Sequence, residues 1–536
     1  MRARCLAARQ SRVVATAHRR PPGLVKRALL GGGLLALLGA APLPPVELIL
    51  RGGTVFTGSG APFTGDVAIV GDRIRAVAPR LNLPAARAID VRGMIVAPGF
   101  IDPHTHVDDD LASDAAERRL VPAFLLQGVT TAFIGNDGNG VPDVAATLAR
   151  ATLRPTGINY ATWVGFGAIR GRVVGRDDRA PTASELAAMN ALIARGMCAG
   201  ALGLSTGLFY APQSYAKTDE VIELARTAAA HGGAYDSHIR DESSYSIGLE
   251  AAIDEALAIG RAARLPVHIA HIKALGVDVE GSAPRIVARI AAARRAGQRV
   301  TADQYPWEAS STSLVAALMP RWAQDGGRAA MLTRLDLPRL RADMTENLRR
   351  RGGATKLLIT QGALAGRTLA DVAAGGDPVA AAIAIVRTSD PDVVSFNQSA
   401  RDIATFMRQP WVMTGSDASS GHPRRYGSFA RKYDEYVVRQ RVLSLRQFIE
   451  RSSTLTARSF GVRDRGELRA GAFADIVVFD PARFAARATY AEPMLTATGV
   501  RHVVVNGVLA VEAGRLTGNA AGRALPKRPA PASCPA

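Results

Sequence analysis

A pattern that recurs eight times in the middle of the chain limits the fold more than any other feature. Each repeat is a short apolar run with polar residues at its end, followed by a helical stretch, and the repeats are spaced mostly by about thirty residues. Eight such units predict an α/β protein with a closed (β/α)8 barrel, whose active site lies at the carboxyl ends of the strands. The candidate strands are GFIDPHTH (99–106), TTAFIGND (130–137), NYATWVGFG (159–167), ALGLSTG (201–207), GGAYDSHI (232–239), PVHIAHIK (266–273), RVTADQYP (299–306) and WVMTGSD (411–417).

The two ends of the chain predict a second, smaller domain. Residues 46–98 contain short alternating runs broken by turns, and a similar texture returns in residues 466–515. We expect these two segments to form one small β-sandwich domain, attached to a barrel that spans residues 99–465. The long stretch before the last barrel strand predicts an insertion at about 312–400, which we interpret as a lid or accessory lobe.

Residues 1–45 are typical of a secretory signal peptide. A basic region that ends at Lys26 and Arg27 is followed by the apolar stretch ALLGGGLLALLGA and then by small residues and prolines. The apolar stretch is shorter than the ~20 residues that span a bilayer. We therefore expect a periplasmic or secreted protein with no stable membrane insertion after signal removal. If the true start lies further downstream, the protein would be cytoplasmic.

The net charge of +19 does not indicate a nucleic-acid-binding protein. Residues 1–30 hold eight Lys or Arg and residues 515–536 hold four, with no acidic residue in either segment. The interior of the chain is therefore only mildly basic, and it contains no basic helix interleaved with aromatic residues. We expect no nucleic-acid partner.

The three cysteines predict no disulfide framework. Cys5 lies in the predicted signal peptide, and Cys534 lies in residues 516–536, whose Pro- and Ala-rich composition is typical of a disordered tail. Cys198 is then the only cysteine within the expected fold. A cysteine metal cluster is excluded for the same reason.

Histidines at the ends of the candidate strands predict a metal site. His104 and His106 are two residues apart in an extended strand, so both imidazoles point to the same face. His238 and His271 lie at the ends of later candidate strands and are further candidate ligands. Asp417 ends the eighth strand, where a carboxylate can bind metal and exchange protons with a substrate, although it could instead cap a helix.

Other histidines have simpler interpretations. His268 precedes His271 by three residues and so points the opposite way, which favours a structural role. His231 lies at a helix-to-strand junction, where a C-cap role accounts for it. His18 and His502 lie outside the predicted barrel.

As a set, the motifs resemble the amidohydrolase superfamily, and within it the N-acyl-D-amino-acid deacylases, also called D-aminoacylases. The resemblance covers nearly the whole chain after the signal peptide. It is carried by PGFIDPHTH, GVTTAFIGND, the SHIR and HIAHIK strands, YPWEASST, TGSDA and the closing GELRAGAFADIVVFD.

The resemblance implies specific roles for several residues. It implies a tight metal site at His238 and His271, a second site near His104 and His106, and Asp417 as catalytic acid/base. It also implies a pocket for the free carboxylate of the substrate, whose matching residues are Lys273, Tyr305, Ser311 and Arg424. These types suit the task, because Arg can bind a carboxylate bidentately while Lys, Tyr and Ser supply further donors.

One position departs from the family. Where the deacylases have a bridging cysteine, this chain has Asp137, after Gly135 and Asn136. A carboxylate can bind zinc and bridge two ions, so we expect Asp137 to be a ligand, with zinc as the metal in one or two sites. The harder ligand could shift the preference to manganese, cobalt or iron. The alternative is that Asp137 caps a turn and binds nothing.

The sequence therefore predicts metal-dependent hydrolysis of an N-acyl-D-amino acid, or of a peptide with a D-residue, to a carboxylate and a D-amino acid. One alternative is a cyclic-amide hydrolase of the hydantoinase or dihydropyrimidinase type; those enzymes use a carboxylated lysine, for which Lys273 is the one candidate. Another is a catalytically inactive binding protein on a metal barrel. The acyl group, the preferred D-side chain and the oligomeric state stay open.

Overall fold

The structure, a computed structural model, describes residues 46–530 and residue 534. The predicted signal peptide at residues 1–45 lies outside the described residues, and so do Cys5 and His18. Within the described part of the chain, no helix combines the length and the apolar character needed to cross a bilayer.

The predicted barrel is confirmed, and all eight candidate strands are present. One parallel sheet has the order β6-β7-β8, and a second has the order β9-β10-β11-β12-β13-β17. Trp163 alone separates β8 from β9, so these two form one barrel strand. The strands are β6 (Phe100–Asp102), β7 (Val129–Ile134), β8 (Asn159–Thr162), β9 (Val164–Gly165), β10 (Gly203–Gly207), β11 (Ala234–His238), β12 (Val267–Ile269), β13 (Val300–Gln304) and β17 (Val412–Thr414).

The barrel closes through backbone contacts between its first and last strands. Thr105 and Ala418 form a parallel bridge. The Asp417 amide donates to the His104 carbonyl at 2.9 Å, and the His106 amide donates to the Ala418 carbonyl at 3.1 Å. Closure therefore brings two predicted ligand segments side by side.

Helices surround the barrel and bury their apolar faces on its strands. In α6, Thr182 and Glu185 form a capping box at the start, and Gly200 ends the helix in the left-handed conformation, as cap rules predict. Its buried apolar side chains are Met189, Leu192, Ile193 and Met197. The helices around the barrel are α1 (Asp108–Ala112), α2 (Ala116–Arg119), α3 (Pro122–Leu125), α4 (Val144–Leu153), α5 (Phe166–Val173), α6 (Ala183–Ala199), η1 (Gln213–Tyr215), α7 (Thr218–Ala230), α8 (Leu249–Ala263), α9 (Ala283–Arg295), α15 (Ala400–Met407), α16 (Arg424–Tyr433), η5 (Asp434–Arg439), α17 (Leu445–Ile449), η6 (Glu450–Thr454) and α18 (Leu455–Phe460).

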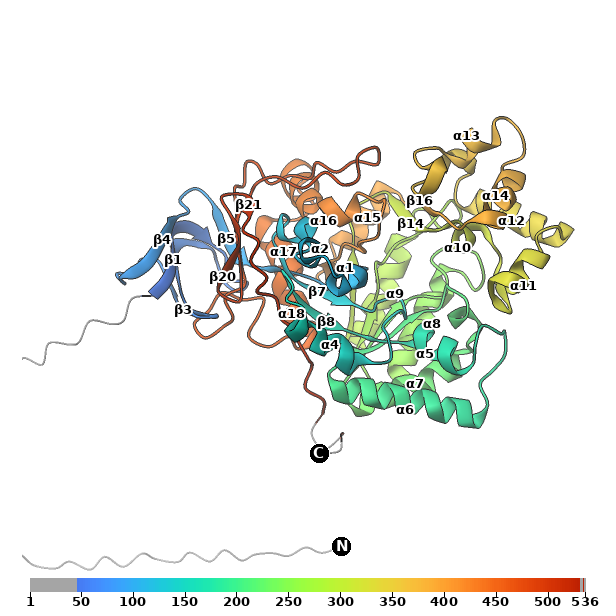
Figure 1. Cartoon of the computed structure of the whole chain (residues 1–536), viewed down its shortest axis with the longest axis horizontal. Helices are drawn as coiled ribbons and strands as arrows, with labels where there is room; N and C mark the ends of the chain where they lie inside the picture. Colours follow the sequence, from blue (N-terminus) through green and yellow to red (C-terminus); the bar gives the residue numbers. More distant parts are fainter. Residues whose placement is uncertain (1–45, 531–533, 535–536) are drawn as a thin grey trace, which may run out of the picture. The chain divides into compact units, whose positions relative to one another are not determined.

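Both ends of the chain contribute to a β-domain, in which blue and red strands lie together (Figure 1). Nine strands join in a single sheet with the order β21-β20-β19-β18-β5-β1-β2-β3, and β4 pairs with β1. The link between the ends is the antiparallel pair of β5 and β18. The strands are β1 (Val46–Val55), β2 (Phe63–Val70), β3 (Arg73–Ala78), β4 (Ala85–Asp90), β5 (Ile95–Pro98), β18 (Ile476–Phe479), β19 (Val500–Val505), β20 (Val508–Glu512) and β21 (Arg515–Leu516).

The stretch between β13 and β17 forms an accessory lobe, drawn in yellow and gold in Figure 1. It runs from Ala309 to Phe396, against the predicted 312–400, and has its own apolar core around Leu340, Met344 and Val386. Its antiparallel sheet has the order β14-β16-β15. The elements are β14 (Ala309–Ser313), α10 (Leu314–Leu318), η2 (Arg321–Gln324), α11 (Gly327–Thr333), α12 (Pro338–Arg350), η3 (Ala354–Lys356), β15 (Leu357–Ile359), η4 (Gly362–Leu364), α13 (Leu369–Ala373), α14 (Pro378–Thr388) and β16 (Asp392–Phe396).

The C-terminal stretch differs from the disordered tail predicted for residues 516–536. Backbone hydrogen bonds attach it to the barrel: Leu525 donates to Tyr160 at 2.8 Å, Lys527 to Gly200 at 2.9 Å and Ala530 to His231 at 3.0 Å. The acceptors lie at or near the starts of β8, β10 and β11, so the tail crosses the amino-terminal end of the barrel. The Pro- and Ala-rich composition gave the wrong prediction of disorder. The tail is held by backbone hydrogen bonds, and side-chain composition does not indicate where these form.

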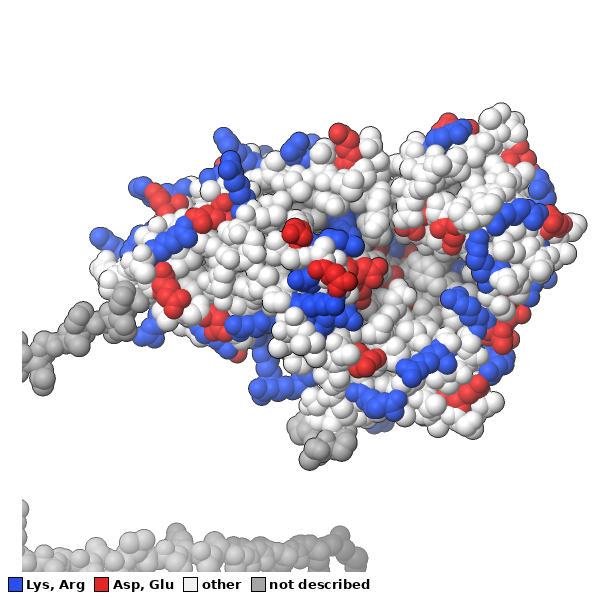
Figure 2. All heavy atoms as spheres, viewed as in Figure 1, with Lys and Arg blue, Asp and Glu red and all other residues white. Residues whose placement is uncertain are grey.

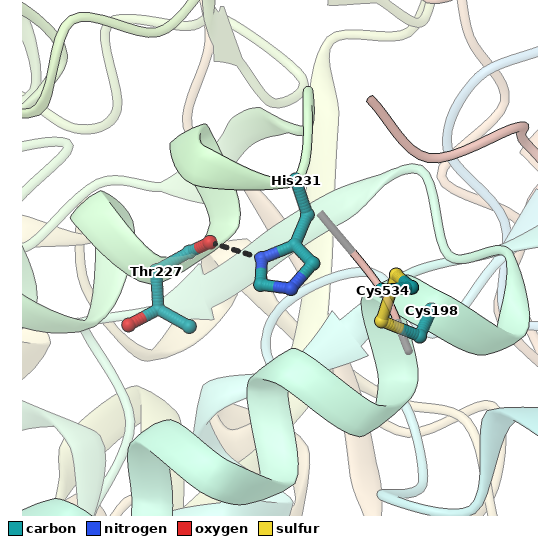
Figure 3. Close-up of a disulfide and its surroundings, with 4 residues drawn as sticks. All are labelled: Cys198, Thr227, His231 and Cys534. Carbon is teal, nitrogen blue, oxygen red and sulfur yellow. Dashed lines mark hydrogen bonds between the residues drawn. A yellow bond between two sulfur atoms is a disulfide. The ribbon is translucent and has the colours of Figure 1, made fainter. Parts of the chain in front are cut away.

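The expectation of no disulfide is wrong. Cys198, near the end of α6, is bonded to Cys534, which is 336 residues further along the chain (Figure 3). His231 lies beside the bond and caps α7, with its ring Nδ1 2.9 Å from the Thr227 carbonyl. The disulfide attaches the end of the tail to the barrel. A single sequence cannot indicate that Cys198 and Cys534 pair, because their proximity depends on the path of the tail.

We expect loss of this disulfide to free the tail and destabilise the fold. Cys198→Ser should lower the free energy of unfolding by about 2–4 kcal/mol, because the crosslink no longer restricts the unfolded chain. Trypsin should cleave the variant faster at Arg523 and Lys527. Denaturant unfolding and mass spectrometry of the digests measure the two effects.

The control is a reducing agent applied to both proteins. It should destabilise the wild type to the level of Cys198→Ser and leave the variant unchanged. A wild-type tail that stays equally protected after reduction would show that the disulfide does not hold it.

Candidate metal centre

Six predicted ligands meet at the carboxyl ends of the barrel strands. They come from five segments far apart in the sequence, which follow or end β6, β7, β11, β12 and β17. All are buried except His106, whose side chain keeps 26% of its exposure. The residues are His104, His106, Asp137, His238, His271 and Asp417.

Asp137 lies at the centre of the cluster. Its Oδ1 is 3.4 Å from His104 Nε2 and 3.5 Å from His271 Nε2. Its Oδ2 is 3.5 Å from His106 Nε2 and 3.7 Å from His238 Nδ1. Each carboxylate oxygen therefore faces two histidines, which is the arrangement of a bridging ligand.

These separations match atoms that share an ion. They exceed the usual length of an N–H···O hydrogen bond. Two ligand atoms at zinc-bond lengths around a tetrahedral ion lie about 3.3 Å apart. Among the described residues, both ring nitrogens of His104, Nε2 of His238 and Oδ1 of Asp137 are buried without a hydrogen-bond partner. A divalent cation would satisfy such atoms, so the residues present fit a metal site.

One pair in the cluster has a different spacing. His238 Nδ1 lies 2.9 Å from His271 Nε2, a hydrogen-bond distance rather than the spacing of two ligands on one ion. The tightest group of candidate ligand atoms consists of His104, Asp137, His271 and Asp417, whose atoms all lie within 4.8 Å of one another.

Asp417 completes the cluster from the end of β17, which lies next to the segment of His104 and His106. Its Oδ1 is 3.2 Å from His106 Nε2 and 3.7 Å from His104 Nε2, and its Oδ2 is 2.8 Å from Arg424 Nη1. Burial raises the pKa of Asp417, but Arg424 and His271 outweigh it and hold the pKa below its usual range. The carboxylate is therefore ionised and able to bind a cation or accept a proton.

The electrostatic field of the cluster favours positive charge. Burial lowers the pKa of His106, yet Asp137 and Asp417 raise it to about 10. Burial raises the pKa of Asp137, but His104 and His271 hold it well below its usual range. A divalent cation would balance the same carboxylate charges that raise the pKa of His106.

The backbone is unusual at three of the ligands. Asp137, His271 and Asp417 have φ values of 56°, 33° and 48°, in or near the left-handed region that few L-residues occupy. Asp is among the residues that enter this region most readily. Such conformations are typical of sites where the surrounding fold imposes the geometry.

His268 has the structural role that its spacing predicted. Its ring nitrogens lie 2.9 Å from Thr301 Oγ1 and 3.0 Å from Asp303 Oδ1. Asp303 Oδ1 also accepts the His271 amide at 2.9 Å. A Cβ at Gly415 would lie 2.1 Å from Asp303 Oδ2, so only glycine fits there. His268 thus supports the cluster from beneath, through Asp303.

A cavity of about 370 Å³ opens beside the cluster. The four residues expected to bind the substrate carboxylate line it: Lys273, Tyr305, Ser311 and Arg424. Arg424 lies close to Tyr305, with its guanidinium carbon 5.0 Å from the ring centroid, and also donates to Ser419. Ser311 belongs to the lobe, whose side of the molecule is hollowed where it meets the barrel (Figure 2).

Glu242 is a site residue that the sequence analysis missed. Its Oε1 lies 2.6 Å from Lys273 Nζ and 3.2 Å from His271 Nδ1, and its Oε2 lies 3.7 Å from His238 Nε2. A carboxylate in contact with ligand imidazoles fixes their orientation. The sequence feature that could have identified Glu242 is its position four residues after His238, in the segment that follows β11.

Comparisons with known proteins identify the family to which the chain is similar. Residues 87–511 match the amidohydrolase family. The chain is 34% identical to D-aminoacylase of Alcaligenes xylosoxydans xylosoxydans, over 90% of this chain and 98% of that protein.

By TM-score and identity, two of the solved structures that match this chain are similar to it in both fold and sequence. A D-aminoacylase structure, from a study of its binuclear metal centre, has a TM-score of 0.77 and 32% identity. N-acyl-D-glutamate deacylase from Bordetella bronchiseptica, complexed with zinc and a phosphonate mimic of the tetrahedral intermediate, has the same TM-score and identity. Each comparison covers 90% of this chain and 100% of the other.

We expect Asp137 to control metal binding. Asp137→Asn should weaken metal binding, because a neutral amide replaces the negatively charged carboxylate. The loss should be at least about 10-fold, since even residues that only orient the ligands of a metal site contribute that much. Asp137→Cys should keep the metal and shift the preference toward zinc, since a thiolate is a softer ligand. Metal content by mass spectrometry after dialysis measures both.

The matched control is Asp254→Asn, which changes an exposed carboxylate on α8 that pairs with Arg289. Its metal content should equal that of the wild type. Full metal content in Asp137→Asn would show that Asp137 is not a ligand.

Proposed function

The chain belongs to the amidohydrolase family, and we propose that it hydrolyses the amide bond of N-acyl-D-amino acids, or of peptides with a D-residue, to a carboxylate and a D-amino acid. One observation carries this proposal. Four histidines and two carboxylates meet beside a cavity that also holds Arg424, Lys273 and Tyr305, so a metal centre and groups that bind a carboxylate are within reach of one small substrate.

The metal that we propose is zinc, in one or two sites. His104, His106, Asp137, His238, His271 and Asp417 would hold it. Manganese, cobalt or iron would also suit this set of imidazole and carboxylate ligands, since it lacks a thiolate. When bound, the ion supplies Lewis acidity, which activates water for attack and polarises the amide carbonyl.

The protein contributes proton transfer through Asp417. Its ionised carboxylate accepts a proton from the attacking water and then delivers it to the departing nitrogen as the C–N bond breaks. The contact with Arg424 keeps Asp417 ionised at the start of the reaction. Water thus adds hydroxide to the carbonyl carbon and a proton to the amine.

The side of the cavity that contains Arg424 would position the substrate. Nε of Arg424 has no hydrogen-bond partner among the described residues, although the atom is buried. A substrate carboxylate can accept from it and from the hydroxyls of Tyr305 and Ser311. Fixing the carboxylate, the amide and the metal at once leaves one enantiomer correctly oriented.

The geometry disfavours a cyclic-amide hydrolase. Lys273, the one candidate for a carboxylated bridge, pairs with Glu242, while Asp137 faces all four histidines from the bridging position.

The test of the function is an assay with acetylated D- and L-amino acids side by side. The protein should hydrolyse D-substrates and leave their L-enantiomers at the uncatalysed rate. A chelator should abolish the activity and added zinc or manganese should restore it, because the ion activates the water. Equal rates on both enantiomers would contradict the proposal.

Asp417→Asn is the matched variant for this assay. It should keep its metal but lose activity by about 100- to 10,000-fold, the usual contribution of general acid–base catalysis. Near-normal activity would remove Asp417 from the mechanism.

We also propose that the protein is exported to the periplasm or secreted. The sequence of residues 1–45 supports this, and so does the Cys198–Cys534 disulfide, because disulfides persist mainly in oxidising compartments. Fractionation of the native cells should find the protein outside the cytoplasm, with its first 45 residues or so removed. An intact N-terminus in the cytoplasmic fraction would contradict export.

A further inference from the structure

One arginine of the accessory lobe lies in the wall of the substrate cavity. Arg351 follows the end of α12 and is only 2% exposed. Its Nε donates to the Ala317 carbonyl at 3.0 Å and its Nη1 to Ser395 Oγ at 2.8 Å. These two bonds fix the guanidinium in place, and the residue lines the same cavity as the metal ligands.

Arg351 lacks a carboxylate partner of the kind that two other buried arginines of the described chain have. Arg170 pairs with Glu220 and Arg465 pairs with Asp475. Among the described residues, no carboxylate lies within 4.0 Å of Arg351, and its Nη2 makes no hydrogen bond to protein. Burying an unpaired charge is costly, so such a group indicates a ligand that supplies the missing negative charge.

A second unpaired donor lies next to it. The Tyr245 ring lies 5.6 Å from the Arg351 guanidinium carbon and 5.9 Å from that of Arg321. The Tyr245 hydroxyl is buried and has no hydrogen-bond partner among the described residues. Tyr245 also lines the cavity. A phenol and a guanidinium together form a donor set for a carboxylate.

The neighbouring acid, Asp241, offsets only part of the positive charge of this corner, because the guanidinium carbons of Arg321, Arg350 and Arg351 lie 5.9, 5.8 and 5.6 Å from the Tyr245 ring centroid. The carboxylate of Asp241 accepts hydrogen bonds from the amides of Ser243, Ser246 and Gly248. Its lone pairs are therefore directed to its own loop. The corner keeps a positive field that favours an anion.

The Arg351 corner is distinct from the pocket at Arg424. Arg424 contacts Asp417, Ser419 and Tyr305, whereas Arg351 contacts Ala317, Ser395 and Tyr245. One cavity thus holds two separate carboxylate-binding groups, and the proposed function uses only the first.

We propose that Arg351 and Tyr245 form a second carboxylate subsite, so that the preferred substrates are N-acyl-D-amino acids that carry two carboxylates. The second carboxylate belongs either to the D-side chain or to the far end of the acyl group. This inference rests on the proposed function and adds the class of substrate to it.

The experiment compares kcat/KM for N-acetyl-D-glutamate, N-acetyl-D-aspartate, N-succinyl-D-alanine and N-acetyl-D-leucine. At least one dicarboxylate should exceed the leucine substrate by about 10-fold or more, the usual effect of a charged hydrogen bond. Preference for an acetylated acid assigns the subsite to the side chain, and preference for the succinyl compound assigns it to the acyl group.

Two variants test the residues. Tyr245→Phe removes only the unpaired hydroxyl and should reduce the ratio of dicarboxylate to leucine kcat/KM by about 10-fold, mainly through KM. Arg351→Met should reduce the ratio further, and Arg351→Lys should restore part of it; thermal unfolding verifies that both still fold. The matched control is Tyr433→Phe, whose hydroxyl bonds to Pro481 away from the cavity, and it should leave the ratio unchanged.

The outcomes separate the two proposals. If the leucine substrate is hydrolysed as well as every dicarboxylate, or if Tyr245→Phe and Arg351→Met leave the ratio unchanged, the subsite is overturned and the deacylase function stands. If no N-acyl-D-amino acid is hydrolysed at all, both proposals fail.

Discussion

The pairing of the first and last barrel strands is the constraint on which the site depends. Two backbone hydrogen bonds, from Asp417 to His104 and from His106 to Ala418, close the barrel. The same bonds place the Asp417 carboxylate against both histidines, which otherwise lie over three hundred residues away in the chain. The same hydrogen bonds therefore both close the barrel and position these candidate ligands, since separating the first and last strands would separate the ligands too.

A carboxylate at position 137 is compatible with both the backbone and the charges around it. The residue has a left-handed φ of 56°, which Asp tolerates better than most residues, and its two oxygens face four imidazoles. Asp137 and Asp417 raise the pKa of His106, and with Glu242 that of His271, to about 10. Electrostatic balance, and not only ligand geometry, thus connects the fold to metal binding.

The eight strands and the fold class could be predicted because each strand carries a local signal, an apolar run with polar residues at its end. The meeting of the six candidate ligands could also be predicted, since a position at a strand's carboxyl end determines which side chains lie together. The disulfide and the ordered tail could not be predicted, because Cys198 meets Cys534 only through the path of backbone that pairs with Tyr160, Gly200 and His231. Glu242 was missed because its role depends on a loop that turns back toward Lys273.

Barrel and lobe both contribute to the cavity, but only the barrel supplies the proposed metal ligands. All six proposed metal ligands come from the barrel, whose closure and buried Asp303 hold them rigidly. The lobe has an independent apolar core and contributes Ser311 and Arg351 to the cavity wall. Substitutions in the lobe can alter the charge and shape of the cavity without moving a ligand, because few contacts of its core involve the barrel strands. The proposed carboxylate subsite, which joins Arg351 at the end of α12 to Tyr245 of the barrel, is thus the kind of feature that can vary while the reaction stays the same.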